Sequence, residues 1–426
     1  MKHKITLAAV AIAAMALTGC STPGAAPQNA SESGTLTIWM MASGPGDSPL
    51  MADVNAEFAK AHPDVKVKIE IQQWADITTK LTTALAQNNS PDIVEIGNTN
   101  VPLYAQGGAL AELNKSKFDN SDEWLAGLEG PATVDKKLFA APLYGGTKVV
   151  MYNTDLFTAA GIAQPPQTMA ELLDDCKTLA AANSGTANFS PFYMPGQFWY
   201  AAMPFIWGAG GEIATENDGA WTGQMSTSAS VQGLRNWKTF QNGCSTPSSV
   251  GLDESTPPQI TPFADGQAAM LLVRAKEQAS VLEANPALKD KLGFFVLPGQ
   301  SADTPLPVMI TGSDIAVAAN SHNKELAVAW LKIMTSQPIQ AKMALNYNLL
   351  PVVPSFLDPA EASGQEKVAL QAAQSNRSVP ATPGWSTLEA DGSVRQLFSS
   401  VAGDTDAATA AETFDGHVKT ALKPLG

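Results

Sequence analysis

The first part of the chain alternates between short apolar runs and longer amphipathic segments. Residues 35–40 and 91–96 are β-rich apolar runs, and residues 65–71 alternate apolar with charged side chains. Between them, residues 48–61 and 75–87 carry apolar side chains at helical spacing. Because strands that alternate with helices usually lie in one sheet, this pattern predicts a largely parallel α/β sheet.

A second section of the same kind begins after Leu143. Thr168 and Glu171 have the spacing of a capping box, which predicts a helix from 168 to about 182. We expect further elements at 149–152 (strand), from Ser228 (helix), from 263 into a buried strand ending at 273, at 315–319 (strand), and at 323–336 (helix). The 426 residues are enough for two or three domains with sizeable cores.

The N-terminal segment has the features of an export signal. A basic start at 1–4 is followed by an apolar stretch, 5–17, that is too short for a stable membrane anchor. Leu17-Thr-Gly-Cys20 resembles a bacterial lipobox, which implies cleavage of a signal peptide, 1–19, and lipid on the sulfur of Cys20. An ordinary signal peptide with an accidental cysteine is the alternative. Residues 20–33 are small and polar and are expected to form a flexible tether.

Composition and charge narrow the possible partners. The chain has 26 Lys and Arg against 40 Asp and Glu, a formal net charge of −14. An acidic chain without a basic stripe argues against nucleic-acid binding and against electrostatic adhesion to anionic lipid. No later apolar run approaches the roughly 20 residues of a membrane helix. The mature protein is therefore expected to be extracytoplasmic and attached to the membrane only through Cys20.

The remaining cysteines and the histidines offer little chemistry. Cys176 and Cys244 lie near the ends of predicted helices in an exported chain, so they form either a disulfide or two buried thiols, and the sequence leaves both open. The histidines show no metal-ligand spacing. G-x-S-x-G, H-E-x-x-H and Walker A motifs are absent. We therefore expect no cofactor, no metal and no catalytic residues.

Seven short motifs, in order along the chain, carry a family resemblance. They are Trp74-Ala-Asp…Lys80-Leu81, Pro91-Asp-Ile-Val-Glu-Ile-Gly97, Gly107-Gly-Ala-Leu110, Tyr152-Asn-Thr-Asp-Leu-Phe157 with Ala160-Gly161 and Pro165-Pro166-Gln-Thr168, Trp207-Gly-Ala-Gly-Gly211, Phe263-Ala-Asp-Gly-Gln-Ala-Ala-Met270, and Asn323-Lys324-Glu325. With the lipobox in front, the chain resembles the maltose-binding-like, family 1 extracellular solute-binding proteins of bacterial ABC sugar importers.

The resemblance implies an α/β fold of two lobes with a hinged ligand cleft between them. Carried over, lobe one comprises 34–145 plus 312–356, and lobe two comprises 146–311 plus 357–426. Ligands of open α/β sheets bind beyond the carboxyl ends of strands, where most of the candidate residues fall.

A sugar site needs aromatic rings for the apolar faces of the sugar and polar groups for its hydroxyls. The candidates for ligand binding are Trp74, Asp76, Asn98, Thr99, Tyr144, Lys148, Trp199, Tyr200, Trp207, Arg274, Ser313, Asp314 and Trp385. At several of these positions a purely structural role is the alternative. Asp76 would be a helix N-cap, Trp74 would cover the core, Trp199 and Tyr200 would pack in the core, and Arg274 would form an ion pair.

The expected function is that of a monomeric substrate-binding lipoprotein, which captures a di- or oligosaccharide and delivers it to the permease subunits of an ABC importer. The main alternative from another class is a lipid-anchored carbohydrate-active enzyme with two catalytic carboxylates, because 40 acidic residues always permit such a pair. Within the binding class, a non-sugar ligand such as a polyamine is the alternative that is hardest to dismiss.

Overall fold

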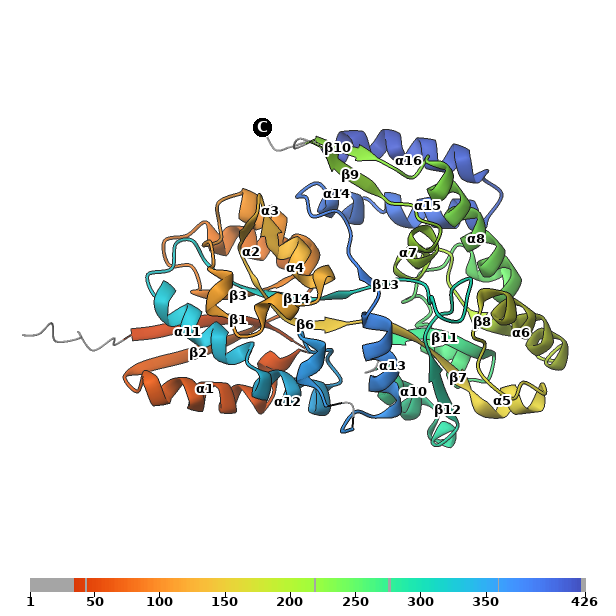
Figure 1. The fold of residues 1–426 in the computed structure, drawn as a ribbon, viewed down its shortest axis with the longest axis horizontal. Coiled ribbons are helices and arrows are strands. Elements are labelled where there is room, and N and C mark those ends of the chain that lie inside the picture. Colours follow the sequence, from red (N-terminus) through yellow and green to blue (C-terminus); the bar gives the residue numbers. More distant parts are fainter. Residues whose placement is uncertain (1–33, 43, 218–219, 275–276, 359, 423–426) are drawn as a thin grey trace, which may run out of the picture.

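The computed structural model describes residues 34–42, 44–217, 220–274, 277–358 and 360–422. The signal peptide, Cys20 and the tether that the sequence predicts lie outside these residues. The described chain forms two lobes, each built on its own β-sheet, with a few segments running between them (Figure 1). Within the described residues, no helix combines the length and the apolar character that crossing a membrane requires.

Lobe one is built on a five-stranded sheet with the order β2-β1-β3-β14-β6. The strands are β1 (Gly34–Met41), β2 (Val65–Gln72), β3 (Ile93–Gly97), β6 (Ala141–Gly146) and β14 (Thr311–Val317). The helices whose apolar faces complete its core are α1 (Leu50–Ala61), α2 (Ile77–Leu85), α3 (Val101–Gln106), α4 (Ala126–Ala132), α11 (Lys324–Met334) and α12 (Gln337–Tyr347). Trp330 on α11 is fully buried, as its helical stripe predicts.

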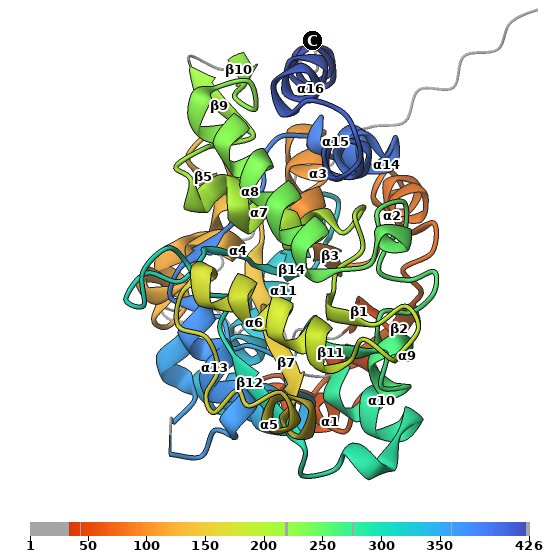
Figure 2. The same cartoon turned by 90° about the vertical axis from the view of Figure 1, so that its right-hand side faces the viewer.

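Lobe two is built on a four-stranded sheet with the order β12-β7-β11-β8. The strands are β7 (Lys148–Asn153), β8 (Ser190–Tyr193), β11 (Ala268–Arg274) and β12 (Leu292–Phe295). Its helices include α5 (Thr154–Ala159), α6 (Met169–Ala182), α7 (Trp199–Gly208), α8 (Ser228–Cys244), α10 (Glu277–Ala284), α13 (Gly364–Ala373), α14 (Trp385–Ala390), α15 (Ser393–Ala402) and α16 (Ala407–Ala421). Seen from the side of lobe two, α6 and α8 lie across its outer surface (Figure 2).

The expectation of a largely parallel sheet is correct for the first three strands and for one pair in lobe two, β8 with β11. β1 pairs in parallel with both β2 and β3, because the intervening helices return the chain to the same edge. β14 is antiparallel to β3 and to β6, and in lobe two β7 is antiparallel to β11 and β12. Both sheets are therefore mixed, because segments that arrive from the other lobe enter them in the reverse direction.

Three connections join the lobes. The first passes from β6 to β7 through the buried Thr147, and the second leads from β13 (Val308–Met309) into β14. The third lies between the short helix η7 (Pro354–Phe356) and α13, which packs on β7 and β12. β15 (Asn376–Arg377) then pairs in parallel with β13, so the second connection and the C-terminal segment run together.

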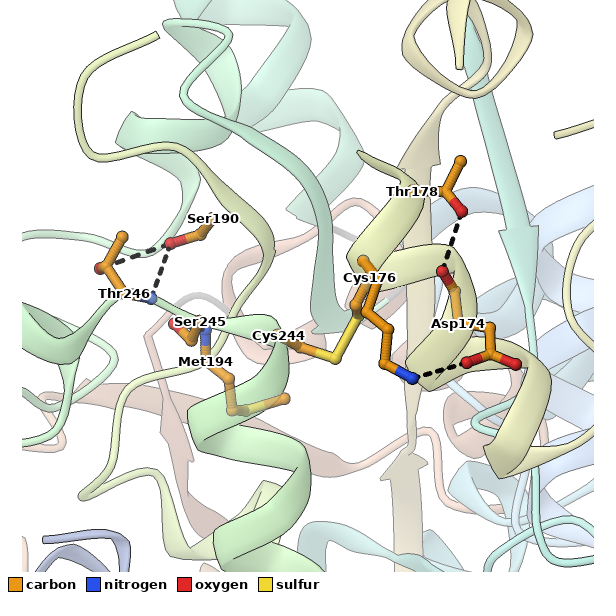
Figure 3. The surroundings of a disulfide bond; sticks show 9 residues. Asp174, Cys176, Thr178, Ser190, Met194, Cys244, Ser245 and Thr246 are labelled. Atoms are coloured by element: carbon orange, nitrogen blue, oxygen red, sulfur yellow. Dashed lines mark hydrogen bonds and ion pairs between the residues drawn. A yellow bond between two sulfur atoms is a disulfide. The ribbon is translucent and has the colours of Figure 1, made fainter. Parts of the chain in front are cut away.

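A disulfide ties two helices of lobe two. The sulfur atoms of Cys176 on α6 and Cys244 on α8 lie 2.18 Å apart, with 5.2 Å between the two Cα atoms (Figure 3). Of the two alternatives that the sequence leaves open, the structure has the bridge. The capping box of α6 is also present, with Thr168 and Glu171 each accepting a hydrogen bond from the other's backbone N–H. Trp237 on α8 is fully buried in the same core.

Candidate functional site

A cavity of about 360 Å³ lies between the lobes, where two of the connections pass. Lobe one contributes Trp74, the end of β6 and the start of β14, while lobe two contributes Arg274 and one face of α13. Gly312 is required here because a Cβ atom at this position would come within 2.2 Å of the carbonyl oxygen of Tyr144. The close approach of β6 and β14 thus fixes the floor of the cavity.

The lobe-one wall is a closed hydrogen-bond network around the buried Glu95. One oxygen of the Glu95 carboxylate accepts from the backbone N–H of Met41 (2.8 Å), and the other accepts from the Tyr144 hydroxyl (2.7 Å). The Ser313 hydroxyl donates in turn to the Tyr144 hydroxyl (3.0 Å). Burial, and then the charge of Glu95, raises the pKa of Tyr144, so this hydroxyl stays neutral. Both Tyr144 and Ser313 line the cavity, where the sequence expected ligand contacts.

Trp74 presents an apolar ring to the cavity. It lies in the bend after β2 and is 46% exposed, one of only three large apolar side chains in the described part of the chain that are exposed to this degree, together with Ile71 and Leu345. A ring in this position has an uncovered face on which a ligand can stack.

Three further lobe-one candidates do not line the cavity. Asp76 is exposed at the N-cap of α2 with φ 57°, and its side chain makes no capping hydrogen bond. Asn98 is buried and donates to the carbonyl of Gly127 (3.4 Å). Thr99 donates across the lobes to the Glu389 carboxylate on α14 (3.4 Å). In this conformation Asp76 therefore belongs to a turn, Asn98 makes a contact within the core, and Thr99 makes a contact between the lobes.

Lobe two holds two cationic candidates, of which Arg274 lines the cavity and Lys148 does not. Lys148 and Arg274 are register partners on β7 and β11, and Arg274 pairs with Glu277 (2.9 Å). No described carboxylate lies within ion-pair distance of Lys148, whose Nζ instead lies 5.3 Å and 5.2 Å from the ring centroids of Phe198 and Tyr200. Burial lowers the pKa of Lys148 to about 8, against the opposing charge of Glu277. Lys148 thus remains a cation whose ammonium lacks a carboxylate partner.

The aromatic candidates of lobe two do not line the cavity. Trp199 stacks on Tyr200, with 3.9 Å between their ring centroids, and it lies 5.7 Å from Trp385. Trp199 is 3% exposed and Trp207 is 4% exposed, so both belong to the core, and Tyr200 alone among the predicted aromatic candidates of lobe two is partly exposed.

Two expectations about cavity contacts need correction. Trp385 is fully buried, because it begins α14 and packs in the lobe-two core, so no face of its ring is free to stack on a ligand. Asp314 is also fully buried, and neither of its carboxylate oxygens has a hydrogen-bond partner among the described residues. Burial raises the pKa of Asp314 well above its ordinary value. A carboxyl group buried in the core of lobe one cannot hydrogen-bond sugar hydroxyls in the cleft.

The structure also places two acidic residues that the sequence did not single out near Tyr200, outside the lining of the cavity. Glu254 lies in the loop before α9 (Ile260–Ala264), and one of its carboxylate oxygens is buried without a hydrogen-bond partner. Glu389 lies on α14 beside Thr99, and burial raises its pKa. The charges of both residues raise the pKa of Tyr200, after the larger effect of burial. Their proximity to Tyr200 arises only from the tertiary fold, and no local motif marks it.

The comparisons with known proteins agree on one family. The family model described as bacterial extracellular solute-binding protein matches residues 42–341. The diacetylchitobiose binding protein DasA of Streptomyces coelicolor is 32% identical over 430 residues, 99% of each chain.

Two solved structures show the same fold. The GacH receptor of Streptomyces glaucescens, determined unliganded and in complex with acarbose, aligns with a TM-score of 0.73 at 24% identity, over 92% of this chain and all of its own. The sugar-binding protein MalE of Xanthomonas citri aligns with a TM-score of 0.76 at 21% identity, over 91% of this chain and 97% of its own.

Proposed function

The chain belongs to the family of bacterial extracellular solute-binding proteins, and from that premise we propose that it is the saccharide receptor of an ABC importer. In this role it captures a di- or oligosaccharide in the cleft between its lobes and delivers it to a separate membrane permease. The proposed receptor is a monomer, needs no cofactor and carries out no catalysis.

The observation that carries this proposal is the chemistry of the cavity. The half-exposed ring of Trp74 offers an apolar surface, and the Tyr144 hydroxyl and the Arg274 guanidinium lie on other walls of the same cavity. A sugar ring has this combination of an apolar C–H face and a polar rim. The volume of about 360 Å³ lies at the lower end of ordinary ligand pockets, which favours a short saccharide.

Diacetylchitobiose is the first ligand to test. The relative named for this disaccharide matches nearly the whole chain, so its ligand is a better guide than that of a relative matching a fragment. A disaccharide of the same linkage without acetamido groups, cellobiose, provides the matched comparison.

Hinged closure follows from the two-lobed architecture. We propose that lobe one comprises 34–145 plus 312–356 and that lobe two comprises 146–311 plus 357–426. Ligand that contacts both lobes favours the closed arrangement over the open one, because only the closed arrangement makes both sets of contacts. The closed conformation would then signal to the permease that the receptor has bound its ligand.

A lipid on Cys20 would keep such a receptor near its permease. We propose that residues 1–19 are removed as a signal peptide and that Cys20 is acylated on its sulfur, with the segment to 33 as a tether. Mass spectrometry of the membrane-extracted N-terminal peptide would detect the acyl chains. A Cys20→Ala protein should bind ligand in solution but support little uptake, and normal uptake by this variant would contradict the anchoring role.

Calorimetric titration of the Cys20→Ala protein against a ligand panel tests the function. The panel contains diacetylchitobiose, cellobiose, maltose, galactooligosaccharides and spermidine. We expect saturable one-to-one binding of at least one saccharide and none of spermidine. A response to spermidine alone would contradict the saccharide proposal, and new products after incubation with a saccharide would contradict the absence of catalysis.

A further inference from the structure

The cavity between the lobes has two chemically different ends. The first, which we call the cleft end, is lined by Trp74, Tyr144, Arg274 and Ser313. The second, which we call the hinge end, lies between α12 of lobe one and α13 of lobe two. Its apolar lining residues are Ala344, Leu349, Leu350, Leu357, Ala369 and Leu370. A ligand that fills the whole cavity therefore meets aromatic and polar side chains at one end and aliphatic side chains at the other.

The sheet of lobe one separates the two ends. The Trp74 ring covers the end of β3, since a Cβ atom on Gly97 would lie 3.7 Å from its Cζ3 atom. From β3 the sheet continues through β14 to β6, and Gly145 of β6 forms an antiparallel bridge with Leu350. Because neighbouring strands lie about 4.8 Å apart, the three spacings from β3 to the Leu350 segment amount to about 14 Å. A ring stacked on Trp74 therefore does not also fill the hinge end.

The backbone at the hinge end keeps its hydrogen bonds within the protein. The N–H of Gly145 donates to the carbonyl of Leu350 (2.8 Å), and the N–H of Leu350 donates to the carbonyl of Gly145 (2.9 Å). The N–H of Asn348 donates to the carbonyl of Ala344 (3.1 Å). These N–H groups are therefore not available to a sugar hydroxyl.

The side chains at the hinge end leave apolar surface uncovered. Glu366, Ala369 and Leu370 are spaced three and four residues apart on α13, so they lie on one face of that helix. The Glu366 carboxylate accepts from the backbone N–H of Ser363 (2.5 Å) within the capping box that begins α13. Leu370 and Leu349 are only partly buried. The hinge end thus retains aliphatic surface that a ligand can remove from water.

A sugar ring is a poor occupant of this surface, because its hydroxyls would lose hydrogen bonds to water without gaining partners. An alkyl or aryl group loses nothing of this kind and gains from burial. We infer that the hinge end is a subsite for an apolar substituent, so that the receptor takes short saccharides that carry an alkyl or aryl aglycone. The sugar lies at the cleft end with Trp74, and the aglycone lies between α12 and α13. This inference rests on the proposed function, because it requires a saccharide at the cleft end.

The test compares methyl and phenyl glycosides of one sugar, so that the paired probes differ only in the aglycone. The β-glycosides of diacetylchitobiose and cellobiose and the α-glycosides of maltose are titrated by calorimetry into the Cys20→Ala protein. In every series that binds, we expect the phenyl glycoside to bind at least about tenfold more tightly than the methyl glycoside. Its binding should also show a more negative change in heat capacity, because that change reports burial of apolar surface.

Two variants assign this preference to the hinge end. Leu349→Asn and Leu370→Asn each place an amide where the aglycone would lie, and each should lower the phenyl-to-methyl affinity ratio to less than about threefold. Leu345→Asn is the matched control, because Leu345 is 39% exposed on α12 and does not line the cavity. This control should keep the full ratio, and a thermal melt of each variant separates lost recognition from lost folding.

Trp74→Ala distinguishes the hinge end from stacking at the cleft end. This substitution should weaken methyl and phenyl glycosides by the same factor, so that the ratio between them stays within about twofold of the unchanged protein's. A ratio that collapses in Trp74→Ala and survives in Leu370→Asn would place the aglycone on the tryptophan and overturn the inference.

The outcomes separate this inference from the proposed function. If phenyl and methyl glycosides bind equally, or if only free saccharides bind, the aglycone subsite is wrong while the receptor function stands. The ratio for the unchanged protein needs no variant to fold, so it decides the matter even if a substitution is destabilising. If neither a saccharide nor a glycoside binds, both proposals are wrong.

Discussion

The two lobes satisfy their buried polar groups in opposite ways. In lobe one, Glu95, Tyr144 and Ser313 hydrogen-bond one another, and the network ends on the backbone of Met41. In lobe two, the Lys148 ammonium lies over the Tyr200 ring without a carboxylate at ion-pair distance, and the Oε2 atom of Glu254 accepts no hydrogen bond, among the described residues. The network of lobe one is therefore complete within the protein, whereas these two groups of lobe two are left without such partners.

This difference assigns separate tasks to the two walls. A wall that is already satisfied provides a rigid platform, on which the ring of Trp74 is the main free surface. On the side of lobe two, Arg274 lines the cavity and pairs with Glu277, so this lobe offers a charged group to the polar rim of a ligand. We therefore expect Trp74 of lobe one to contribute general saccharide affinity.

The largest effects should distinguish Trp385 of lobe two, which supports stability, from Trp74 of lobe one, which supports ligand binding. Trp385→Ala removes a fully buried ring behind the lobe-two wall and should lower the free energy of unfolding by about 3–5 kcal/mol. Trp74→Ala removes a half-exposed ring and should change the unfolding free energy by less than about 0.5 kcal/mol, yet weaken binding of every saccharide about tenfold. Urea unfolding and calorimetric titration measure the two quantities.

Ile71→Ala is the matched control for Trp74→Ala. Ile71 is 40% exposed on β2 and does not line the cavity, so its removal should alter neither quantity appreciably. Normal saccharide binding by the Trp74→Ala protein would contradict the role of Trp74 as the platform of lobe one.

An intermediate effect should come from the disulfide, which lies in lobe two alone. Replacing both Cys176 and Cys244 with Ala frees the loop between two residues 68 apart in sequence, which should cost about 2–4 kcal/mol. Because the lobes have separate cores, the loss should appear in a transition reported by lobe-two elements, measured by hydrogen exchange during urea unfolding. Equal loss of protection in β1 and β3 would show that the lobes unfold as one unit, and the Cys20→Ala protein is the control.

The smallest effect should be a pH dependence that belongs to lobe two. Lys148 has a pKa of about 8, lowered by burial and by Arg274 and raised by Glu277 and Glu254. Ligand that accepts a hydrogen bond from the ammonium favours the protonated form, so affinity should be highest below pH 8. It should fall by up to about tenfold for each unit above that pH.

Calorimetry between pH 6.5 and 9.5 measures this slope, and Lys148→Met should flatten it. The raised pKa values of Tyr144 and Tyr200 keep the titration of both hydroxyls above this window. A slope that persists in Lys148→Met would assign the titration to another group.

The fold was predictable wherever local chemistry decides structure. The capping box at Thr168 and the alternation in β2 each announce an element by spacing alone. The antiparallel entry of β14 was not predictable, because its direction depends on a chain that has first passed through lobe two. Strand order of this kind is a tertiary property that no local pattern encodes.

The same limit applies to the site. Tyr144, Arg274 and Ser313 lie at the ends or beginnings of strands, so their approach to the cavity follows from strand positions. Trp385 follows Pro and Gly, which favoured a loop, yet it begins a helix and packs against Trp199, which is far away in sequence. Glu254 carried no local signal, because the two groups whose pKa values it raises, Tyr200 and Lys148, are contributed by α7 and β7.

The described chain starts with β1 in lobe one and ends with α16 in lobe two (Figure 1). The two ends of the folded part therefore belong to different lobes. Rotation of one lobe against the other at the three connections alters the separation between these ends. Fluorescent proteins fused before Gly34 and after α16 would turn that rotation into a change in energy transfer. The receptor architecture is thereby already arranged as a reagentless optical sensor, whose signal would report occupancy in real time without labelling a single site in the cleft.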